Sequence, residues 1–338
     1  MSVASGLDVV LEALPWAASP VGLLTHDPAH TGDGRPGRVA LLERGARICR
    51  LFSPEHGLDA TAREGAEVGD LTDALTGLPV ISLYGKRRAP APEDLAGLEV
   101  LVIDLQDVGA RCYTYQSTMV LALRAAAEVG LPVWVLDRPN PVTGRHVEGI
   151  VRRPEEQSFV GLLPVPMRHG LTLGEIATWA SPPGLNLRVV PARGWSRELW
   201  WDQTGLSWTP PSPAIPDPDT ALAYLGTVLL EGTTWATGRG TPAPFRVVAG
   251  PERPVTVTWS DRDRYRPVAA GIRLLERLCQ ERGGPSWSNG GRTLDLLFGS
   301  PELRRMLERG ESVEPLVERG FEEGRAFAAA TEGCRLYP

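Results

Sequence analysis

The chain has 338 residues, 42% of them hydrophobic and 22% charged, with a formal net charge of −6. An acidic chain disfavours nucleic acid as a partner, because phosphate binding needs a basic surface. No apolar run is long enough to span a membrane, and the N-terminus lacks the basic start of a signal peptide, so we expect a cytoplasmic protein. The four cysteines lie far apart and form no CxxC pair, as is typical of reduced thiols rather than a zinc site.

The N-terminal residues are typical of a short amphipathic helix, and five apolar runs then alternate with helical segments. The runs cover residues 21–27, 47–57, 78–86, 99–109 and 131–141. Nearly continuous Val, Ile and Leu indicate strands that are buried on both faces. Helices are predicted at residues 38–45, 92–97 and 115–130. This alternation predicts an α/β fold with a mostly parallel sheet flanked by helices.

The pattern becomes looser in the second half of the chain. A helix at residues 171–180 and a strand at 185–192 are followed by a Pro- and Trp-rich stretch at 200–218, where we expect a long ordered loop. Further predicted elements are a helix at 219–233, strands within 245–250 and 254–261, and helices at 267–282 and after 293. We place a domain boundary near residue 193, which gives an α/β domain of residues 1–192 and a smaller α+β domain of residues 193–338.

Polar side chains follow all five predicted strands of the first half. Ligands of open parallel sheets bind beyond the carboxyl ends of the strands. Loops are polar in any case, but five such tails together favour a ligand crevice. Asp104 ends an apolar strand and must be paired if buried, and Arg111 is its expected partner. The polar residues of these tails are Thr25, His26, Glu55, His56, Tyr84, Asp104, Gln106, Asp107, Arg111, Asp137, Arg138 and Asn140.

Two local motifs suggest ligands that we consider less favoured. Residues 32–37 read GDGRPG, a literal dinucleotide-binding pattern, but several residues separate it from the preceding strand. A surface loop before the helix at 38–45 is the preferred interpretation. His26 and His30 have i, i+4 spacing, but Pro28 between them disfavours the helix that would bring both to one metal. We therefore predict no metal and no cofactor.

Two further segments carry charged groups near predicted helix ends. Thr172 and Glu175 have the spacing of a capping box, so Glu175 is expected to be a cap. His169 precedes this cap and could contact an anion at the helix N-terminus. Glu231 lies at the end of a predicted helix, where a carboxylate is electrostatically disfavoured, and Arg239 follows between two glycines.

Several motifs in order resemble the exo-beta-N-acetylmuramidase family, glycoside hydrolase family 171, formerly a domain of unknown function. They include FSPEHG, GLPVISLYG, DLQDVGARCYTY, VLDRPNPVTG, VPMRHGLTLGE and LLEGTTWATGRGT. The resemblance runs from about residue 6 to the C-terminus. It implies a Rossmann-like catalytic domain, a smaller domain that closes a cleft, and release of N-acetylmuramic acid from the non-reducing end of peptidoglycan fragments.

The resemblance also implies a catalytic role for Glu55. We therefore expect Glu55 as general acid/base, His56 beside it, and Asp107 or Glu231 as the second catalytic group, unless the substrate's acetamido group assists. N-acetylmuramate carries a carboxylate, which a guanidinium suits. The residues expected to bind substrate are Gln106, Arg111, Tyr113, Asp137, Arg138, Asn140, His169 and Arg239.

The chain departs from the family pattern at three places. Ala214 stands where the family usually has Asn, an Asn of the family pattern is also missing near His26 and Asp27, and the stretch between Pro251 and Val255 is shortened. These departures motivate an alternative, a muropeptide-binding protein that keeps the crevice but has impaired catalysis.

Overall fold

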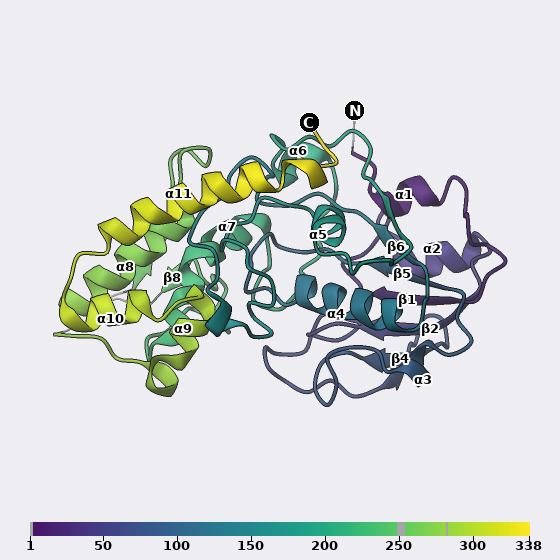
Figure 1. The fold of residues 1–338 in the computed structure, drawn as a ribbon, viewed down its shortest axis with the longest axis horizontal. Helices are drawn as coiled ribbons and strands as arrows, with labels where there is room; N and C mark the ends of the chain where they lie inside the picture. The colour runs from purple at the N-terminus through teal and green to yellow at the C-terminus, as the bar shows by residue number, and fades with distance from the viewer. Residues whose placement is uncertain (1–2, 249–253, 282) are drawn as a thin grey trace.

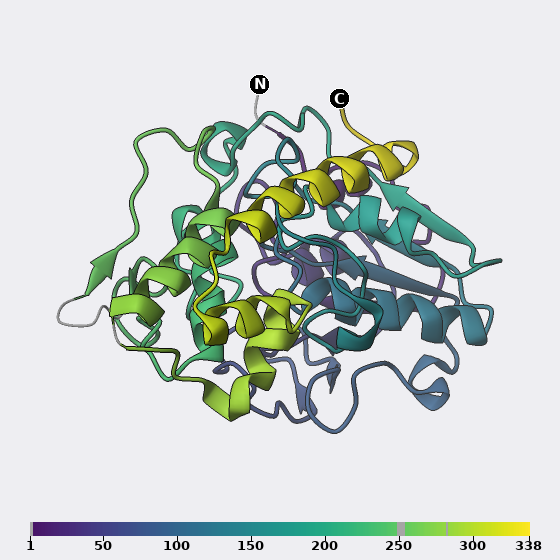
Figure 2. The same ribbon diagram turned by 60° about the vertical axis from the view of Figure 1, so that its left-hand side comes forward.

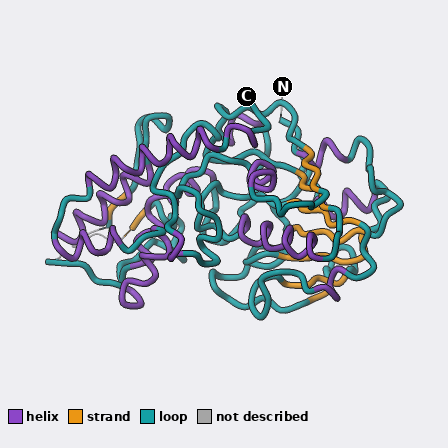
Figure 3. Tube along the Cα trace, viewed as in Figure 1, coloured by secondary structure: helices purple, strands orange, loops and turns teal. Residues whose placement is uncertain are grey.

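The computed structural model describes residues 3–248, 254–281 and 283–338. A seven-stranded sheet with the order β3-β4-β2-β1-β5-β6-β7 forms one end of this described part (Figures 1 and 3). All of its neighbouring strands are parallel except β3, which pairs antiparallel with β4 at the edge. The predicted α/β fold with a mostly parallel sheet is confirmed. The strands are β1 (Val21–Thr25), β2 (Ile48–Ser53), β3 (Leu71–Thr72), β4 (Pro79–Ser82), β5 (Val100–Asp104), β6 (Val133–Leu136) and β7 (Leu187–Val190).

Helices cover both faces of the sheet. Because side chains alternate along a strand, Leu101 and Ile103 of β5 pack on one side and Val100 and Val102 on the other. The first side is covered by α3 (Pro92–Leu95), α4 (Tyr115–Glu128) and α5 (Leu173–Trp179), the second by α1 (Gly6–Val10) and α2 (Gly37–Glu43). Burial on both faces explains why the strands are nearly uniformly apolar in sequence.

The strand order reverses between β1 and β5, which is where ligands of such sheets commonly bind. Here the protein's own groups meet at that point. Nε2 of His26, after β1, accepts a 2.8 Å hydrogen bond from the backbone N–H of Gln106, after β5. The guanidinium of Arg138, after β6, donates to both oxygens of Asp104, at 2.6 and 3.0 Å.

The expected pairing of Asp104 with Arg111 is therefore wrong. Asp104 ends β5 and Arg138 comes shortly after its parallel neighbour β6, so their side chains meet at the same sheet edge. Arg111 comes after a turn at Gly109, whose φ is +77°, and is directed elsewhere.

The second half of the chain is mostly helical and packs on the α4 side of the sheet. Side chains such as Leu275, Leu294 and Leu316 belong to the same apolar cluster as Leu123 of α4. The predicted loop at 200–218 is wrong in one place, because a short helix forms there, and the helix predicted at 219–233 changes to a 3-10 helix after Thr227. The elements are η1 (Pro154–Glu156), α6 (Trp201–Thr204), α7 (Pro218–Thr227), η2 (Val228–Gly232), β8 (Val247–Val248), β9 (Val255–Thr256), α8 (Pro267–Glu281), η3 (Ser288–Gly291), α9 (Arg292–Phe298), α10 (Glu302–Arg309), α11 (Glu314–Ala330) and η4 (Glu332–Cys334).

Helix α11 runs along one side of the molecule and returns the chain to the sheet (Figure 2). Beyond it, the hydroxyl of Tyr337 donates a 2.6 Å hydrogen bond to Asp137 and accepts one of 2.9 Å from the backbone N–H of Ala192. No helix among the described residues is long and apolar enough to cross a membrane.

Candidate active site

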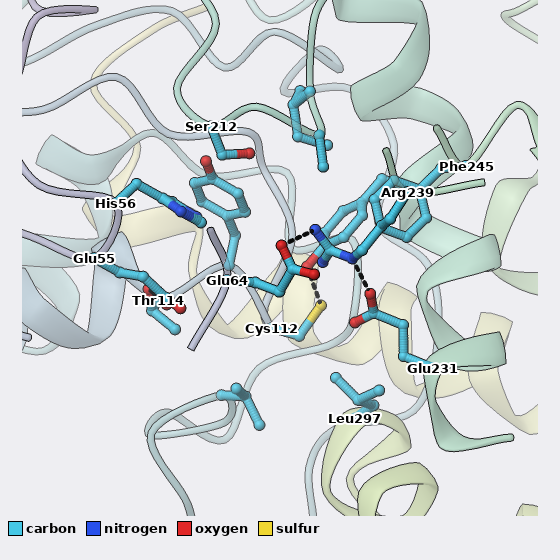
Figure 4. Close-up of a pocket in the computed structure, with 15 residues that line it drawn as sticks. Glu55, His56, Glu64, Cys112, Thr114, Ser212, Glu231, Arg239, Phe245 and Leu297 are labelled. Carbon is cyan, nitrogen blue, oxygen red and sulfur yellow. Dashed lines mark hydrogen bonds and ion pairs between the residues drawn. The ribbon is translucent and has the colours of Figure 1, made fainter. Parts of the chain in front are cut away.

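A cavity of about 110 Å³ lies where the loops after β2 and β5 meet the segments around α7 and η2 (Figure 4). Figure 3 shows that this middle part of the molecule, between the sheet and the C-terminal helices, is mostly loop. The cavity is lined on its apolar side by residues such as Phe245 and Leu297. Its polar lining includes Glu55, His56, Glu64, Tyr113, Thr114, Ser212, Glu231 and Arg239.

Glu55 is 7% exposed, and its carboxylate is held from two sides. Oε2 accepts a 2.6 Å hydrogen bond from the hydroxyl of Thr114, and Oε1 accepts one of 3.1 Å from the backbone N–H of Gly65. Thr114 directly precedes α4, so the carboxylate lies near the N-terminus of a 14-residue helix. The end of β2 thus places a fixed carboxyl group at the cavity wall.

His56 is buried beside Glu55 and adopts a left-handed backbone conformation, with φ of +71°. Its Nδ1 donates a 2.8 Å hydrogen bond to the carbonyl oxygen of Ala62. Burial lowers the pKa of His56 below its ordinary value, which favours the neutral imidazole near pH 7. In that state Nδ1 carries the proton, and Nε2 is left as an acceptor.

Two tyrosines are close to the Glu55 carboxylate. Burial and the neighbouring Glu55 raise the pKa of Tyr84 above its ordinary value. Burial also raises the pKa of Tyr113, whose ring packs edge-on against Tyr115 at 4.8 Å between centroids. Both phenols are therefore held in the protonated form, in which they can donate hydrogen bonds.

The side of the cavity formed by the C-terminal half carries a cation between two carboxylates. Nε of Arg239 donates to Glu231, and its Nη1 lies 3.1 Å from Oε2 of Glu64. Its guanidinium also lies over the ring of Phe245, at 4.8 Å from the centroid. In the view of Figure 4, Glu64 lies between the Glu55 end and the Arg239 end of the cavity.

Five of the twelve residues predicted for the site line this cavity: Glu55, His56, Tyr113, Glu231 and Arg239. The other seven do not. Among these, Asp107 is buried, with Oδ2 accepting from the backbone N–H of Gly109 at 2.8 Å and Oδ1 without a partner among the described residues. Burial raises the pKa of Asp107 to about 7.

Arg111, also outside the cavity lining, is 1% exposed. Its guanidinium donates four hydrogen bonds to carbonyl oxygens, those of Ile150, Val165, Leu297 and Phe298. This group therefore connects the loops after β6 to helix α9 in the second half of the chain.

The remaining residues outside the cavity hold loops near the sheet. Gln106 donates to the carbonyl oxygens of Asp107 and Pro139, and Asn140 donates to that of Leu171. Nδ1 of His169 accepts from the backbone N–H of Leu171 at 3.1 Å, and burial lowers the pKa of His169 to about 3. It is therefore a neutral, buried ring.

Asp137 fixes the start of α5. It accepts from the Thr172 hydroxyl at 2.7 Å and from the backbone N–H of Gly174 at 2.7 Å, and burial raises its pKa to about 6. The capping box of Thr172 and Glu175 predicted at this helix is confirmed.

The predicted surface loop at GDGRPG is also confirmed. Residues 32–35 are exposed, and the backbone N–H of Gly32 donates to Asp8, while α2 begins after them at Gly37. Within residues 3–248, 254–281 and 283–338, no three His, Cys, Asp or Glu side chains are grouped to hold a metal ion.

Sequence reasoning missed Glu64, Thr114 and Ser212. Thr114 could have been noticed, because a threonine directly before a predicted helix is a common cap, yet its hydroxyl here serves Glu55 instead. Glu64 lies in a polar turn without periodicity, so nothing in the sequence indicated it.

Comparison with protein families assigns both halves of the chain. Residues 21–219 match the N-terminal model of the exo-beta-N-acetylmuramidase NamZ family, and residues 253–337 match its C-terminal model. The chain belongs to the NamZ family. The boundary near residue 193 remains a prediction.

Known members and solved structures agree over nearly the whole chain. The chain is 35% identical to the peptidoglycan beta-N-acetylmuramidase NamZ of Bacillus subtilis, over 94% of this chain and 86% of that protein. Two DUF1343 family proteins of Bacteroides fragilis have TM-scores of 0.90 and 0.82 at 28% and 26% identity. In both cases the likeness covers 100% of this chain and 99% of the other.

One of the departures from the NamZ family pattern is at the cavity. Ala214 is buried and lines it, so a small apolar side chain stands where a polar one is expected. Most of the shortened stretch at 251–255 lies outside the described residues.

Proposed function

We propose that this protein is an exo-acting glycoside hydrolase that releases beta-linked N-acetylmuramic acid from the non-reducing end of peptidoglycan fragments. Membership of the NamZ family supports the reaction class. The observation that supports Glu55 as general acid/base is its carboxyl group, which lines the cavity while Thr114 and Gly65 fix both oxygens. A catalytic carboxyl group must be held in place in this way to act within hydrogen-bond reach of the leaving oxygen.

In the proposed reaction, the Glu55 carboxyl donates its proton to the glycosidic oxygen as the bond from that oxygen to C1 of the muramic sugar breaks. Water supplies the new hydroxyl at C1, and Glu55 takes back a proton. The neutral His56 and the protonated Tyr113 line the same cavity and would hydrogen-bond sugar hydroxyls. Among the carboxylates considered for the second role, Glu231 lines the cavity and Asp107 does not, which favours Glu231.

The proposal also assigns a different role in the site to each half of the chain. Residues 1–192 would supply the acid/base group, and residues 193–338 would close the cleft with Glu231 and Arg239. The substrate would be a muropeptide or a MurNAc–GlcNAc saccharide produced by earlier cleavage of the cell wall, and we infer that the protein acts on it in the cytoplasm.

Substitution of Glu55 tests the acid/base role. Glu55→Gln keeps the size of the side chain but cannot transfer a proton, so hydrolysis of the MurNAc–GlcNAc disaccharide should fall by about 10²- to 10⁴-fold. The natural disaccharide is the right substrate, because a nitrophenyl leaving group needs less protonation. Glu67→Gln, which changes an exposed carboxylate of the same loop, is the matched control. Disaccharide cleavage by Glu55→Gln at the wild-type rate would refute the assignment.

The same assay separates the enzyme from the alternative, a binding protein with impaired catalysis. Ala214 at the cavity wall is the observation that favours this alternative. Calorimetric binding of the disaccharide to the wild-type protein, with no N-acetylmuramic acid released over a long incubation, would support it. Release of N-acetylmuramic acid that stops in Glu55→Gln would exclude it.

A further inference from the structure

The MurNAc–GlcNAc saccharide, one of the two proposed substrates, carries a free carboxylate on its lactyl group, whereas in a muropeptide that carboxyl is an amide. A site for the saccharide needs a cation, and this inference rests on that part of the proposed function. The arginines first considered for this role differ sharply in the structure. Arg111 is occupied by four carbonyl oxygens and Arg138 by Asp104, and neither lines the cavity. Arg239 does line the cavity, but it contacts Glu231 and Glu64.

The charges of the empty cavity oppose an anionic ligand. Three carboxylates, those of Glu55, Glu64 and Glu231, face the single guanidinium of Arg239 among the described lining residues. Burial lowers the pKa of His56, so that ring adds no positive charge near pH 7. A substrate carboxylate therefore becomes favourable only if one of the protein's carboxylates leaves Arg239.

The two partners of Arg239 are anchored differently. Glu231 belongs to η2, its backbone carbonyl accepts a 2.8 Å hydrogen bond from Ser288, and its side chain is 25% exposed. Glu64 belongs to a turn in the loop after β2, and its side chain is 51% exposed. An exposed ion pair contributes little to stability, so the Glu64 contact breaks more easily.

The small size of the cavity is a second reason to expect that a side chain moves. At about 110 Å³ it is smaller than typical small-molecule sites, which measure about 300–1,000 Å³. Glu64 lines this cavity, and in the view of Figure 4 it lies between Glu55 and Arg239. Displacement of this side chain would enlarge the cavity and free one edge of the guanidinium at the same time.

We propose that Glu64 is a specificity-determining residue that occupies the place of the substrate's lactyl carboxylate on Arg239 and is displaced by it. A sugar with the carboxylate replaces one ion pair by another. A sugar without it, or with its carboxylate converted to an amide, gains no ion pair when Glu64 leaves. The exchange thereby favours muramic sugars whose lactyl group is free.

Two matched substrates test the exchange: the para-nitrophenyl muramide with a free lactyl carboxylate and its lactyl methylamide. The measured quantity is the ratio of their KM values. Glu64→Gln removes the competing charge, so the KM of the acid relative to the amide should fall by about two- to fivefold. Arg239→Gln should raise that relative KM by about tenfold or more. Glu67→Gln loses the same charge in the same loop away from Arg239 and should leave the ratio unchanged.

A double variant shows whether Glu64 acts through Arg239. In an Arg239→Gln background, Glu64→Gln should no longer change the ratio, because the two substitutions remove the same interaction. An effect of Glu64→Gln that is equal for acid and amide, or that persists without Arg239, would overturn the proposal.

Binding measurements test the exchange at Arg239 separately from the proposed glycosidase activity. Calorimetry with free N-acetylmuramic acid and its lactyl amide requires no turnover, and Glu64→Gln should again favour the acid by about two- to fivefold. Selective binding without hydrolysis would support the exchange and refute the glycosidase. If every variant hydrolyses or binds the acid and the amide equally well, the exchange is refuted and the proposed glycosidase activity is not.

Discussion

The hydroxyl of Thr114 donates a 2.6 Å hydrogen bond to Oε2 of Glu55, although Thr114 occupies the capping position of α4. Its side chain makes no capping bond to the helix. The threonine thus links the N-terminus of α4 to the carboxyl group that follows β2, and we infer that it positions Glu55 for proton transfer.

Replacement of Thr114 should show whether its hydroxyl positions Glu55 for catalysis or only stabilises the fold. A hydrogen bond to a charged group contributes about 1.5–3 kcal/mol, so Thr114→Val should lower kcat on the disaccharide by about tenfold or more. Thr114→Ser keeps the hydroxyl and should retain most of the activity. A valine variant with unchanged kcat and an intact fold by circular dichroism would contradict the positioning role.

Arg111 should matter for stability more than for substrate. Arg111→Met leaves four buried carbonyl oxygens without their donor, which should lower the free energy of unfolding by about 3–5 kcal/mol, measured by urea denaturation. Arg124→Met, an exposed arginine of α4, is the control. A variant of normal stability with a raised KM would instead restore the substrate-binding role predicted from the sequence.

Asp107 predicts a particular dependence of stability on pH. Burial raises the pKa of this carboxyl group from an ordinary 3.8 to about 7. Between about pH 4 and pH 7 the folded protein therefore holds a proton that the unfolded chain has lost, so this group lowers the free energy of unfolding as pH rises through that window. Above about pH 7 the Asp107 carboxyl group is ionised in both states, and the free energy of unfolding falls no further through this group.

Asp107→Asn does not titrate, so its stability relative to the wild type should increase with pH across that window. The increase should reach up to about 4 kcal/mol. Urea unfolding at several pH values measures it, with the exposed Asp59→Asn as control. A constant difference between Asp107→Asn and the wild type at all pH values would contradict the raised pKa.

The sequence was sufficient for the sheet because burial on both faces produces uninterrupted apolar runs. The runs at 21–27 and 99–109 contain β1 and β5, although the strands end earlier than the runs suggested. Strand β3 was missed because its two residues are exposed and too short for any periodicity. The short helix α6 was missed for the same reason of length.

The site was harder to predict, because a sequence shows that a residue follows a strand but not where its side chain points. Glu55 and Arg138 both follow strands, yet Glu55 lines the cavity and Arg138 pairs with Asp104. Burial of an arginine such as Arg111 depends on carbonyl groups 186 and 187 residues away, at Leu297 and Phe298. Such contacts have no local signal.

The hydrogen bond from Tyr337 to Asp137 joins two residues that are 200 positions apart in the sequence. Asp137 is fully buried, so the second-to-last side chain of the chain belongs to the interior of the sheet domain. Loss of the Tyr337 hydroxyl, as in Tyr337→Phe, would therefore leave this buried carboxyl group with one donor fewer and weaken the attachment of the segment after α11 to the sheet.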